Sequence, residues 1–418
     1  QHDGGGHFLD RTLTSGIPLL NRPSGVIAFD YDADGDLDLY ITQNFSPAVL
    51  ARNDGGFSFT NTAPEAGVDH SGPSEGAAAG DFDGDGRLDL YVGLYGEANR
   101  FYHNTGDGRF KEIAAELGVD DDGRAWQVVF FDADRDGDAD LYVSNDKRWH
   151  FSDMRNRFYE NIGGVFVDRS AESEADANIY SMGVAIGDFD GNLFLDLYCT
   201  NLAVESNALF LNRGIPDEPA DPDDSVSFLA AEELAGVESH RLGWGAVFFD
   251  YDNDGHQDLY VCNESAPNRL YRHVGRWPAV DVAPELGLDD SGGNFCAAVA
   301  DIDADGDLDV LENDAGQRIR LYINHEGENR RWARFRIVGP PGDAFAVGAI
   351  VDVRTNRTWR TREVIAGSNL KSQNELIQHV GLGDAGLIDE VVVTWPGGTT
   401  RRLYDLPVNT TFTITPPE

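Results

Sequence analysis

The sequence predicts an all-β protein, a β-propeller followed by a small β-sandwich-like module. Three observations support this fold class. An acidic nine-residue motif occurs six times, starting at residues 30, 81, 132, 188, 250 and 301. Short apolar, strand-like runs flank each copy, and from about Trp332 such runs continue without the motif. Repeats of about 50 residues that are filled with short strands are typical of propeller blades.

The elements of each repeat follow in the same order. A strand that ends in Gly-Val or a similar pair comes first, as in residues 59–68 and 110–119. An apolar inner strand, the acidic motif, an LYV-like strand and a hairpin come next. The hairpins are indicated by Gly-rich turns between alternating apolar residues, as in residues 99–110. This order predicts four antiparallel strands in each repeat.

The two ends of the repeat region predict how the ring closes. Residues 8–17 form an element that elsewhere ends a repeat, while the sixth repeat runs out after its third strand near residues 319–327. We therefore expect the N-terminal strand to complete the last blade of a six-bladed ring. A seventh blade would have to come from the C-terminal segment. An insertion at residues 214–227 is predicted to be a polar surface loop.

The acidic motif has the chemistry of a Ca²⁺ loop. Carboxylates at positions 1, 3, 5 and 9 can converge on one hard cation, because a glycine at position 6 lets the backbone turn sharply enough for a carbonyl near position 7 to join them. Mg²⁺ is the lesser candidate because it keeps its waters. A single acidic turn is more often a solvated hairpin, but six copies favour five to six Ca²⁺ sites.

The fourth copy, DFDGNLFLD, is the poorest, with Leu193 in place of the glycine and Asn192 in place of the fifth-position aspartate, so a weak site and an empty turn both stay open. The predicted metal ligands are Asp30, Asp32, Asp34, Asp36 and Asp38; Asp81, Asp83, Asp85 and Asp89; Asp132, Asp134, Asp136, Asp138 and Asp140; Asp188, Asp190, Asn192 and Asp196; Asp250, Asp252, Asp254 and Asp258; and Asp301, Asp303, Asp305, Asp307 and Asp309.

Composition limits the partners of the protein. The 418 residues carry a formal net charge of −41, and 26 of the aspartates lie in the six motifs. The electrostatic field of this large negative charge repels nucleic acid and anionic membrane surfaces. No apolar run reaches the length of a membrane span. Loops of modest Ca²⁺ affinity fill where calcium is millimolar, which favours a secreted or periplasmic location. The oligomeric state is not predicted.

The motifs resemble those of a known family. The six loops with their flanking strands look like the FG-GAP/VCBS repeats of integrin-type β-propellers. The tail resembles the ASPIC/UnbV module, in AVGAIVDV at residues 346–353 and REVIAGSNLKSQNE at residues 362–375. The pair of predicted domains, residues 1–331 and 332–418, is similar to the cartilage acidic protein family. This resemblance implies a calcium-binding, secreted or periplasmic propeller.

Function is expected where the repeats differ. Six places before each loop stand Ser24, Glu75, Trp126, Met182, Trp244 and Phe295, which we expect to form a ring at the face opposite the loops. These side chains could plug the channel or line a ligand pocket. The candidate ligand-binding residues at this open face are Trp126, Trp244, Phe295, Arg124, Tyr180 and Arg241, together with Lys147, Trp149 and His150 from an unusual loop of the third repeat.

Two function classes remain open from the sequence. The first is a calcium-rigidified platform that binds a glycan, a protein or an apolar small molecule. The second is a cyclase, isomerase or lyase in which Glu75 transfers a proton while the aromatic side chains shape the substrate. Nucleotide-binding and hydrolytic motifs are absent from the sequence. We favour the binding platform.

Overall fold

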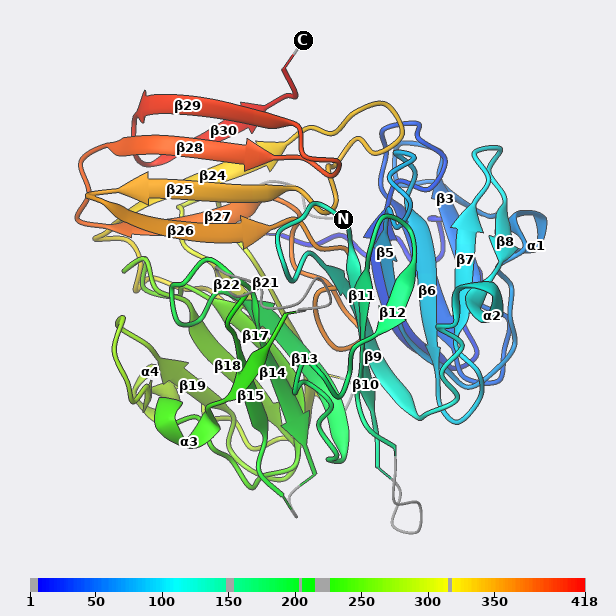
Figure 1. The fold of residues 1–418 in the computed structure, drawn as a ribbon, viewed down its shortest axis with the longest axis horizontal. Helices are drawn as coiled ribbons and strands as arrows, with labels where there is room; N and C mark the ends of the chain where they lie inside the picture. Colours follow the sequence, from blue (N-terminus) through cyan, green and yellow to red (C-terminus); the bar gives the residue numbers. More distant parts are fainter. Residues whose placement is uncertain (1–6, 148–153, 203–204, 215–225, 315–317, 418) are drawn as a thin grey trace.

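The computed structural model describes residues 7–147, 154–202, 205–214, 226–314 and 318–417. The candidate residues Trp149 and His150 lie outside these ranges, as does most of the insertion at 214–227. None of the helices in the described part of the chain is long and apolar enough to cross a membrane. The fold is all-β, as predicted, and Figure 1 shows the sheets of the repeats grouped apart from the C-terminal strands.

The six repeats form six separate antiparallel sheets in the described residues, with five of four strands and a sixth of three. The strands of the first three sheets are β1 (Pro23–Phe29), β2 (Asp38–Gln43), β3 (Val49–Asn53) and β4 (Phe59–Asn61); β5 (Ser74–Gly80), β6 (Asp89–Leu94), β7 (Arg100–Asn104) and β8 (Phe110–Glu112); and β9 (Ala125–Phe131), β10 (Asp140–Asn145), β11 (Arg157–Asn161) and β12 (Phe166–Asp168).

The other three sheets repeat this arrangement. Their strands are β13 (Ser181–Gly187), β14 (Asp196–Asn201), β15 (Ala208–Asn212) and β16 (Phe228–Ala230); β17 (Gly243–Phe249), β18 (Asp258–Asn263), β19 (Arg269–Arg272) and β20 (Val280–Asp281); and β21 (Asn294–Ala300), β22 (Asp309–Asp314) and β23 (Ile319–Tyr322). The first strands of successive sheets pack side by side from β1 to β21, which places them nearest the axis. Each acidic motif joins the first strand of a sheet to the second.

The prediction of one strand that runs up to the Gly-Val pair is wrong in its second half. Residues 59–68 contain the three-residue strand β4 and then one helical turn, α1 (Ala63–Ala66), which Gly67 ends at a φ of 80°. Left-handed glycines are the usual helix terminators. The same turn recurs three times, as α2 (Ala114–Leu117), α3 (Glu232–Ala235) and α4 (Ala283–Leu286).

The expected closure by the N-terminal strand is also wrong for the described residues. Residues 8–17 form none of the strands of the sixth sheet. Instead, the carbonyl of Ser15 accepts a hydrogen bond of 2.6 Å from Phe59 N–H, and Ile17 and Leu20 pack on the apolar face of β2 and β3. The physical reason is that this outer face of the first sheet would otherwise be exposed to water.

The ring is interrupted between its first and last sheets. A cavity of about 580 Å³ lies there, between β1 on one side and β21 and β22 on the other, and residues 372–377 form part of its wall. We call this space the wedge. It is lined mainly by apolar side chains, among them Val26, Leu39, Ala298 and Leu311.

The C-terminal strands form two sheets. One has the order β27 (Gln378–Gly383), β24 (Arg331–Ile337), β30 (Thr410–Ile414), and the other has the order β26 (Thr358–Glu363), β25 (Ile350–Thr355), β28 (Ile388–Thr394), β29 (Thr400–Leu406). Their apolar side chains form a single buried cluster with those of the first two propeller sheets, including Phe29 and Phe335. The C-terminal module is therefore packed onto the propeller rather than tethered to it.

Candidate functional site

The acidic loops share one backbone-to-carboxylate pattern. In the first loop the Asp30 carboxylate accepts hydrogen bonds from the N–H groups of Asp34 (3.2 Å) and Gly35 (2.9 Å). The ninth residue, Asp38, accepts from Tyr31 N–H (3.2 Å) and from Asn53 N–H of the third strand (2.7 Å). Gly35 has a φ of 90°, which permits the sharp turn. The pattern holds the first and last carboxylates in place.

Carboxylate oxygens converge inside these loops. One oxygen from each residue lies within 4.8 Å of the others in sets that include Asp30, Asp32 and Asp38; Asp81, Asp83 and Asp89; and Asp132, Asp134 and Asp136. The first and ninth positions are the most buried, and burial raises the pKa of Asp38 to about 7. Desolvated carboxylates at this spacing repel one another unless a cation joins them.

An Asn at or just after the end of the third strand anchors two neighbouring loops in the second, third, fourth and sixth repeats, a feature that the sequence did not reveal. The amide of Asn104 donates to the carbonyl of Leu88 in its own repeat (3.1 Å) and to that of Tyr31 in the preceding loop (2.9 Å). Equivalent bonds join Asn161 to Phe82 (2.8 Å) and Asn212 to Ala133 (2.8 Å). The signal that could have revealed these contacts is an Asn two places after an aromatic residue, at Asn104, Asn161, Asn212 and Asn324.

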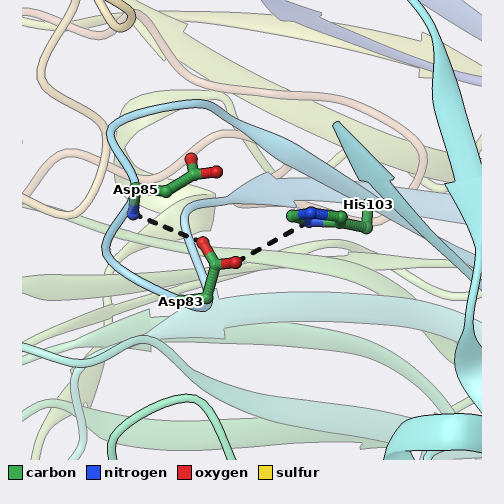
Figure 2. Close-up of side chains that lie close together, drawn as sticks. All are labelled: Asp83, Asp85 and His103. Carbon is green, nitrogen blue, oxygen red and sulfur yellow. Dashed lines mark hydrogen bonds and ion pairs between the residues drawn. The ribbon is translucent and has the colours of Figure 1, made fainter. Parts of the chain in front are cut away.

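The residue before this Asn contacts the loop and differs between repeats. In the second repeat it is His103, whose Nδ1 lies 3.1 Å from Asp89 and 3.9 Å from Asp83, and Figure 2 shows it facing Asp83 and Asp85. The hydrogen bond to Asp89 raises the pKa of His103. In the third repeat it is Glu160, which adds negative charge near Asp134. The loops therefore differ in the charge that surrounds them.

In the fourth loop the side chain of Asn192 forms hydrogen bonds with backbone groups. Leu193, in place of the glycine, has a φ of 80°. The side-chain amide of Asn192 donates to the carbonyl of Asn212 (2.7 Å), and its oxygen accepts from Phe194 N–H (2.8 Å). Asn192, one of the predicted ligands, thus stabilises the turn.

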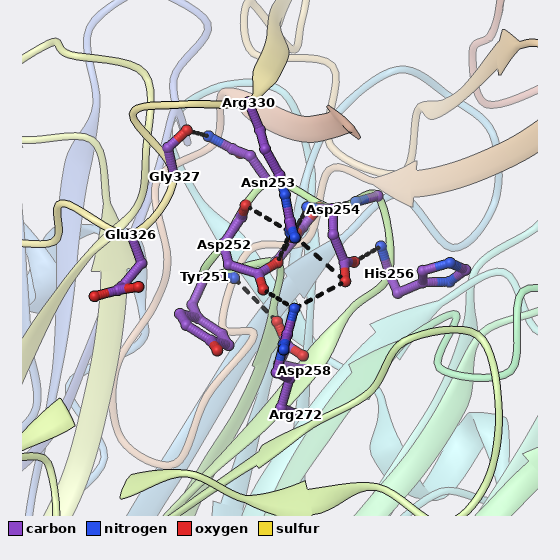
Figure 3. A network of polar contacts seen from close by, with 12 residues as sticks. Tyr251, Asp252, Asn253, Asp254, His256, Asp258, Arg272, Glu326, Gly327 and Arg330 are labelled. Carbon is purple, nitrogen blue, oxygen red and sulfur yellow. Dashed lines mark hydrogen bonds and ion pairs between the residues drawn. The ribbon is translucent and has the colours of Figure 1, made fainter. Parts of the chain in front are cut away.

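Two arginines from outside the fifth loop pair with its aspartates. Arg272, from the third strand, lies 2.7 Å from Asp252, and Arg330, from the segment before β24, lies 2.6 Å from the other oxygen of the same carboxylate. Asp254 is 3.8 Å from Arg272 and 3.7 Å from Arg330. Figure 3 shows both arginines directed at these two aspartates.

Five of the six side chains predicted to form a ring at the open face are linked by contacts, namely Ser24, Glu75, Trp126, Trp244 and Phe295. Glu75 is 5% exposed and accepts hydrogen bonds from Ser24 and from Asn44 (3.0 Å). It also forms an ion pair of 2.6 Å with Lys371 of the C-terminal module, whose ammonium lies 4.5 Å from the centre of the Trp126 ring. The candidate general acid or base is thus held between a hydroxyl, an amide and an ammonium.

The aromatic residues of the ring pack on one another. Tyr95, Trp126, Trp244 and Phe295 form a chain of edge-to-face contacts with ring centroids 5.2, 5.3 and 4.8 Å apart. The indole N–H of Trp244 donates to Glu264 (2.8 Å). Such geometry stabilises the aromatic pairs themselves. These side chains fill the centre of the open face.

The remaining described candidates of this face are two cations in ion pairs, Arg124 and Lys147, together with Tyr180 and Arg241. Arg124 lies 4.3 Å from the Tyr95 ring and 3.8 Å from Asp146. Lys147 pairs with Glu205 at 3.1 Å and lies 5.8 Å from the ring of Tyr180. Arg241 is half-buried in the segment ahead of β17. Of these residues, Arg124 contacts the aromatic chain, at Tyr95.

Residues 366–375 of the C-terminal module run along the propeller axis, which sequence reasoning did not predict. We call this stretch the channel segment. It bonds to the first strands of the first, third and sixth sheets, as in Gln373 with both backbone groups of Ala28 (3.1 Å each), Gln127 with the carbonyl of Ser368 (3.4 Å) and Asn374 with Val299 N–H (3.0 Å). Its run of small and amide side chains is the signal for this role. Lys371 reaches the open face at its tip.

Comparisons with known proteins agree with this architecture. Residues 30–92, 81–143 and 250–312 match the FG-GAP-like repeat, and residues 339–418 match the family described as ASPIC and UnbV. The chain is an FG-GAP-repeat protein with a C-terminal ASPIC and UnbV domain. The FG-GAP match covers the first, second, third, fifth and sixth loops, and the ASPIC and UnbV match includes the channel segment.

This FG-GAP-repeat protein is similar to cartilage acidic protein 1. It is 25% identical to the Homo sapiens protein over 416 residues, which cover 90% of this chain and 60% of the relative. The Xenopus tropicalis protein is also 25% identical, with 94% of this chain and 64% of the relative covered. The chain thus spans less than two thirds of these relatives. A solved structure of BBS1N in complex with ARL6DN matches with a TM-score of 0.45 at 10% identity, covering 94% of each chain, and nothing about function follows from it.

Proposed function

We propose that this FG-GAP-repeat protein is a secreted or periplasmic calcium-binding propeller that serves as a ligand-binding platform. The observation that carries the calcium proposal is the convergence of carboxylate oxygens in the first loop, where no lysine or arginine of the described residues pairs with Asp30, Asp32 or Asp38. Three buried oxygens, Oδ1 of Asp32, of Asp301 and of Asp307, have no hydrogen-bond partner. Carboxylate oxygens are the ligands that Ca²⁺ prefers, and a buried unpartnered oxygen is costly without a cation.

Calcium in these loops would fix the contacts between blades. The carbonyl of Tyr31, inside the first loop, accepts the amide of Asn104 from the next sheet, and the carbonyl of Phe82 in the second loop accepts that of Asn161. A cation that holds each loop therefore supports the neighbouring sheet as well. The similarity to cartilage acidic proteins and the millimolar calcium outside cells support the extracellular location.

The first test counts the calcium ions bound per chain. Equilibrium dialysis against ⁴⁵Ca²⁺ is expected to find several ions on the wild type and about one fewer on Asp32→Asn, because that substitution removes a carboxylate from the first loop. The matched control is Asp120→Asn, an exposed aspartate outside the loops, which should bind as many ions as the wild type. A wild-type protein that binds no calcium at millimolar concentration would contradict the proposal.

The wedge supports an apolar small molecule as the ligand of the platform. Its volume of about 580 Å³ suits a ligand of drug-like size, and its apolar walls carry a few polar groups, from Arg336, Gln373 and Glu375. At the open face, in contrast, the aromatic side chains pack on one another and on Lys371. We therefore place ligand binding in the wedge and not at the open face.

The second test uses the fluorescent probe 8-anilinonaphthalene-1-sulfonate. The wild type is expected to bind it with enhanced emission, and Leu311→Asp is expected to weaken binding about tenfold, because a carboxylate then enters an apolar wall and repels the sulfonate of the probe. Ile319→Asp is the matched control, since Ile319 is 74% exposed on the neighbouring strand and does not line the wedge. Equal weakening by both variants, or by neither, would contradict binding in the wedge.

A further inference from the structure

The fifth loop has two arginines on a single carboxylate, whereas in the sixth loop one arginine, Arg334, pairs with Asp301 at 2.8 Å. Both oxygens of the Asp252 carboxylate carry an arginine, with Arg272 on Oδ2 and Arg330 on Oδ1. Asp252 is 6% exposed, so these pairs are largely shielded from water. Arg330 also donates to the Asp252 carbonyl (3.0 Å). The third position of this loop therefore has no oxygen free for a metal ion.

An arginine at the position of Arg272 does not by itself occupy the carboxylates of the adjacent loop. In the first repeat the equivalent residue is Arg52, but it pairs with Asp54 of the hairpin at 2.8 Å and leaves Oδ1 of Asp32 without a partner. The fifth repeat differs because a second arginine arrives from the segment that leads into the C-terminal module. Two guanidinium groups within 4 Å of Asp252 and Asp254 repel a divalent cation and use the carboxylates that would bind it.

The C-terminal module also forms hydrogen bonds with the fifth loop of the propeller. Asn253 is fully buried, and its side-chain oxygen lies 2.7 Å from His379 Nε2, while its carbonyl accepts from Gly383 N–H (2.8 Å). Arg360 donates to the carbonyl of Gly255 (2.9 Å). Figure 3 shows Arg330 and Gly327, from the connecting segment, around the same loop. These contacts fix the backbone of the fifth loop against the C-terminal module.

We propose that the fifth loop is a metal-free joint in which Arg272 and Arg330 replace calcium and lock the C-terminal module to the propeller. This inference rests on the proposed calcium binding of the other loops. Of the predicted calcium ligands Asp250, Asp252, Asp254 and Asp258, the pair Asp252 and Asp254 binds the protein's own arginines here, while Asp250 and Asp258 accept hydrogen bonds from the backbone. The full chain is thus expected to bind no more than five calcium ions.

The test compares the same substitution in two loops of the full chain. Asp252→Asn is expected to leave the number of bound ⁴⁵Ca²⁺ ions unchanged and to lower the melting temperature equally in calcium and in EDTA. Asp32→Asn in the first loop is expected to lose one ion. Loss of one ion from both variants would overturn the joint alone, whereas a wild type that binds no calcium would overturn the proposed function.

A second variant decides the matter if Asp252→Asn does not fold. Arg272→Gln combined with Arg330→Gln is expected to bind at least as many calcium ions as the wild type, because two carboxylates are released. Its melting temperature in EDTA is expected to be lower than that of the wild type, because the joint has lost its cations. Fewer bound ions, or an unchanged melting temperature in EDTA, would overturn the inference.

Discussion

EDTA is expected to lower the melting temperature of this protein by about 15 °C. A ligand present at 100 times its Kd stabilises the folded state by about 2.7 kcal/mol per site. Five such sites in a chain of 418 residues correspond to a shift of roughly this size, given the usual entropy of unfolding per residue. The effect should be large because the loops anchor neighbouring sheets through Asn104, Asn161 and Asn212. Scanning calorimetry in calcium and in EDTA measures it.

The control for this experiment is recovery. Excess Ca²⁺ added after EDTA should restore the original melting temperature, while the same concentration of Mg²⁺ should restore little of it, because Mg²⁺ is poorly suited to cages built from protein oxygens alone. An unchanged melting temperature in EDTA would contradict the assignment of the loops. Equal recovery by both ions would point to general screening of the −41 charge instead.

Glu75→Gln is expected to lower the free energy of unfolding by about 3 kcal/mol, because removing one partner of a buried ion pair leaves the other charge uncompensated. Here the remaining charge is the Lys371 ammonium, which lies against Trp126 at the tip of the channel segment. The pair joins the open face of the propeller to the C-terminal module. Urea denaturation followed by tryptophan fluorescence measures the change.

Glu97→Gln is the matched control, since Glu97 is an exposed carboxylate in the second repeat, and the change should cost less than about 0.5 kcal/mol. The result separates two roles of Glu75. Loss of stability supports a structural ion pair, which the contacts favour. Unchanged or increased stability would instead agree with an acid–base residue held at a cost to the fold.

The local pattern of the sequence determined the repeated parts of the fold. A six-fold acidic motif with a glycine at its turn, as in Gly35, requires a strand on each side, and the side chains of Asp30 and Asp38 are held by backbone groups a few residues away. The ring position of Glu75, Trp126 and Trp244 also followed from counting back along each repeat. Such features depend on short-range geometry, which repeats in the sequence as it does in space.

Tertiary structure alone decided what each repeated position contacts. The N-terminal segment covers the first sheet, Lys371 reaches Glu75 from 296 residues away, and Arg330 enters the fifth loop from 78 residues away. None of these contacts is indicated by a repeat period or a residue spacing in the sequence. The acidic motif fixes where negative charge gathers, but which protein cations reach it depends on which distant side chains the packing of the two domains brings close.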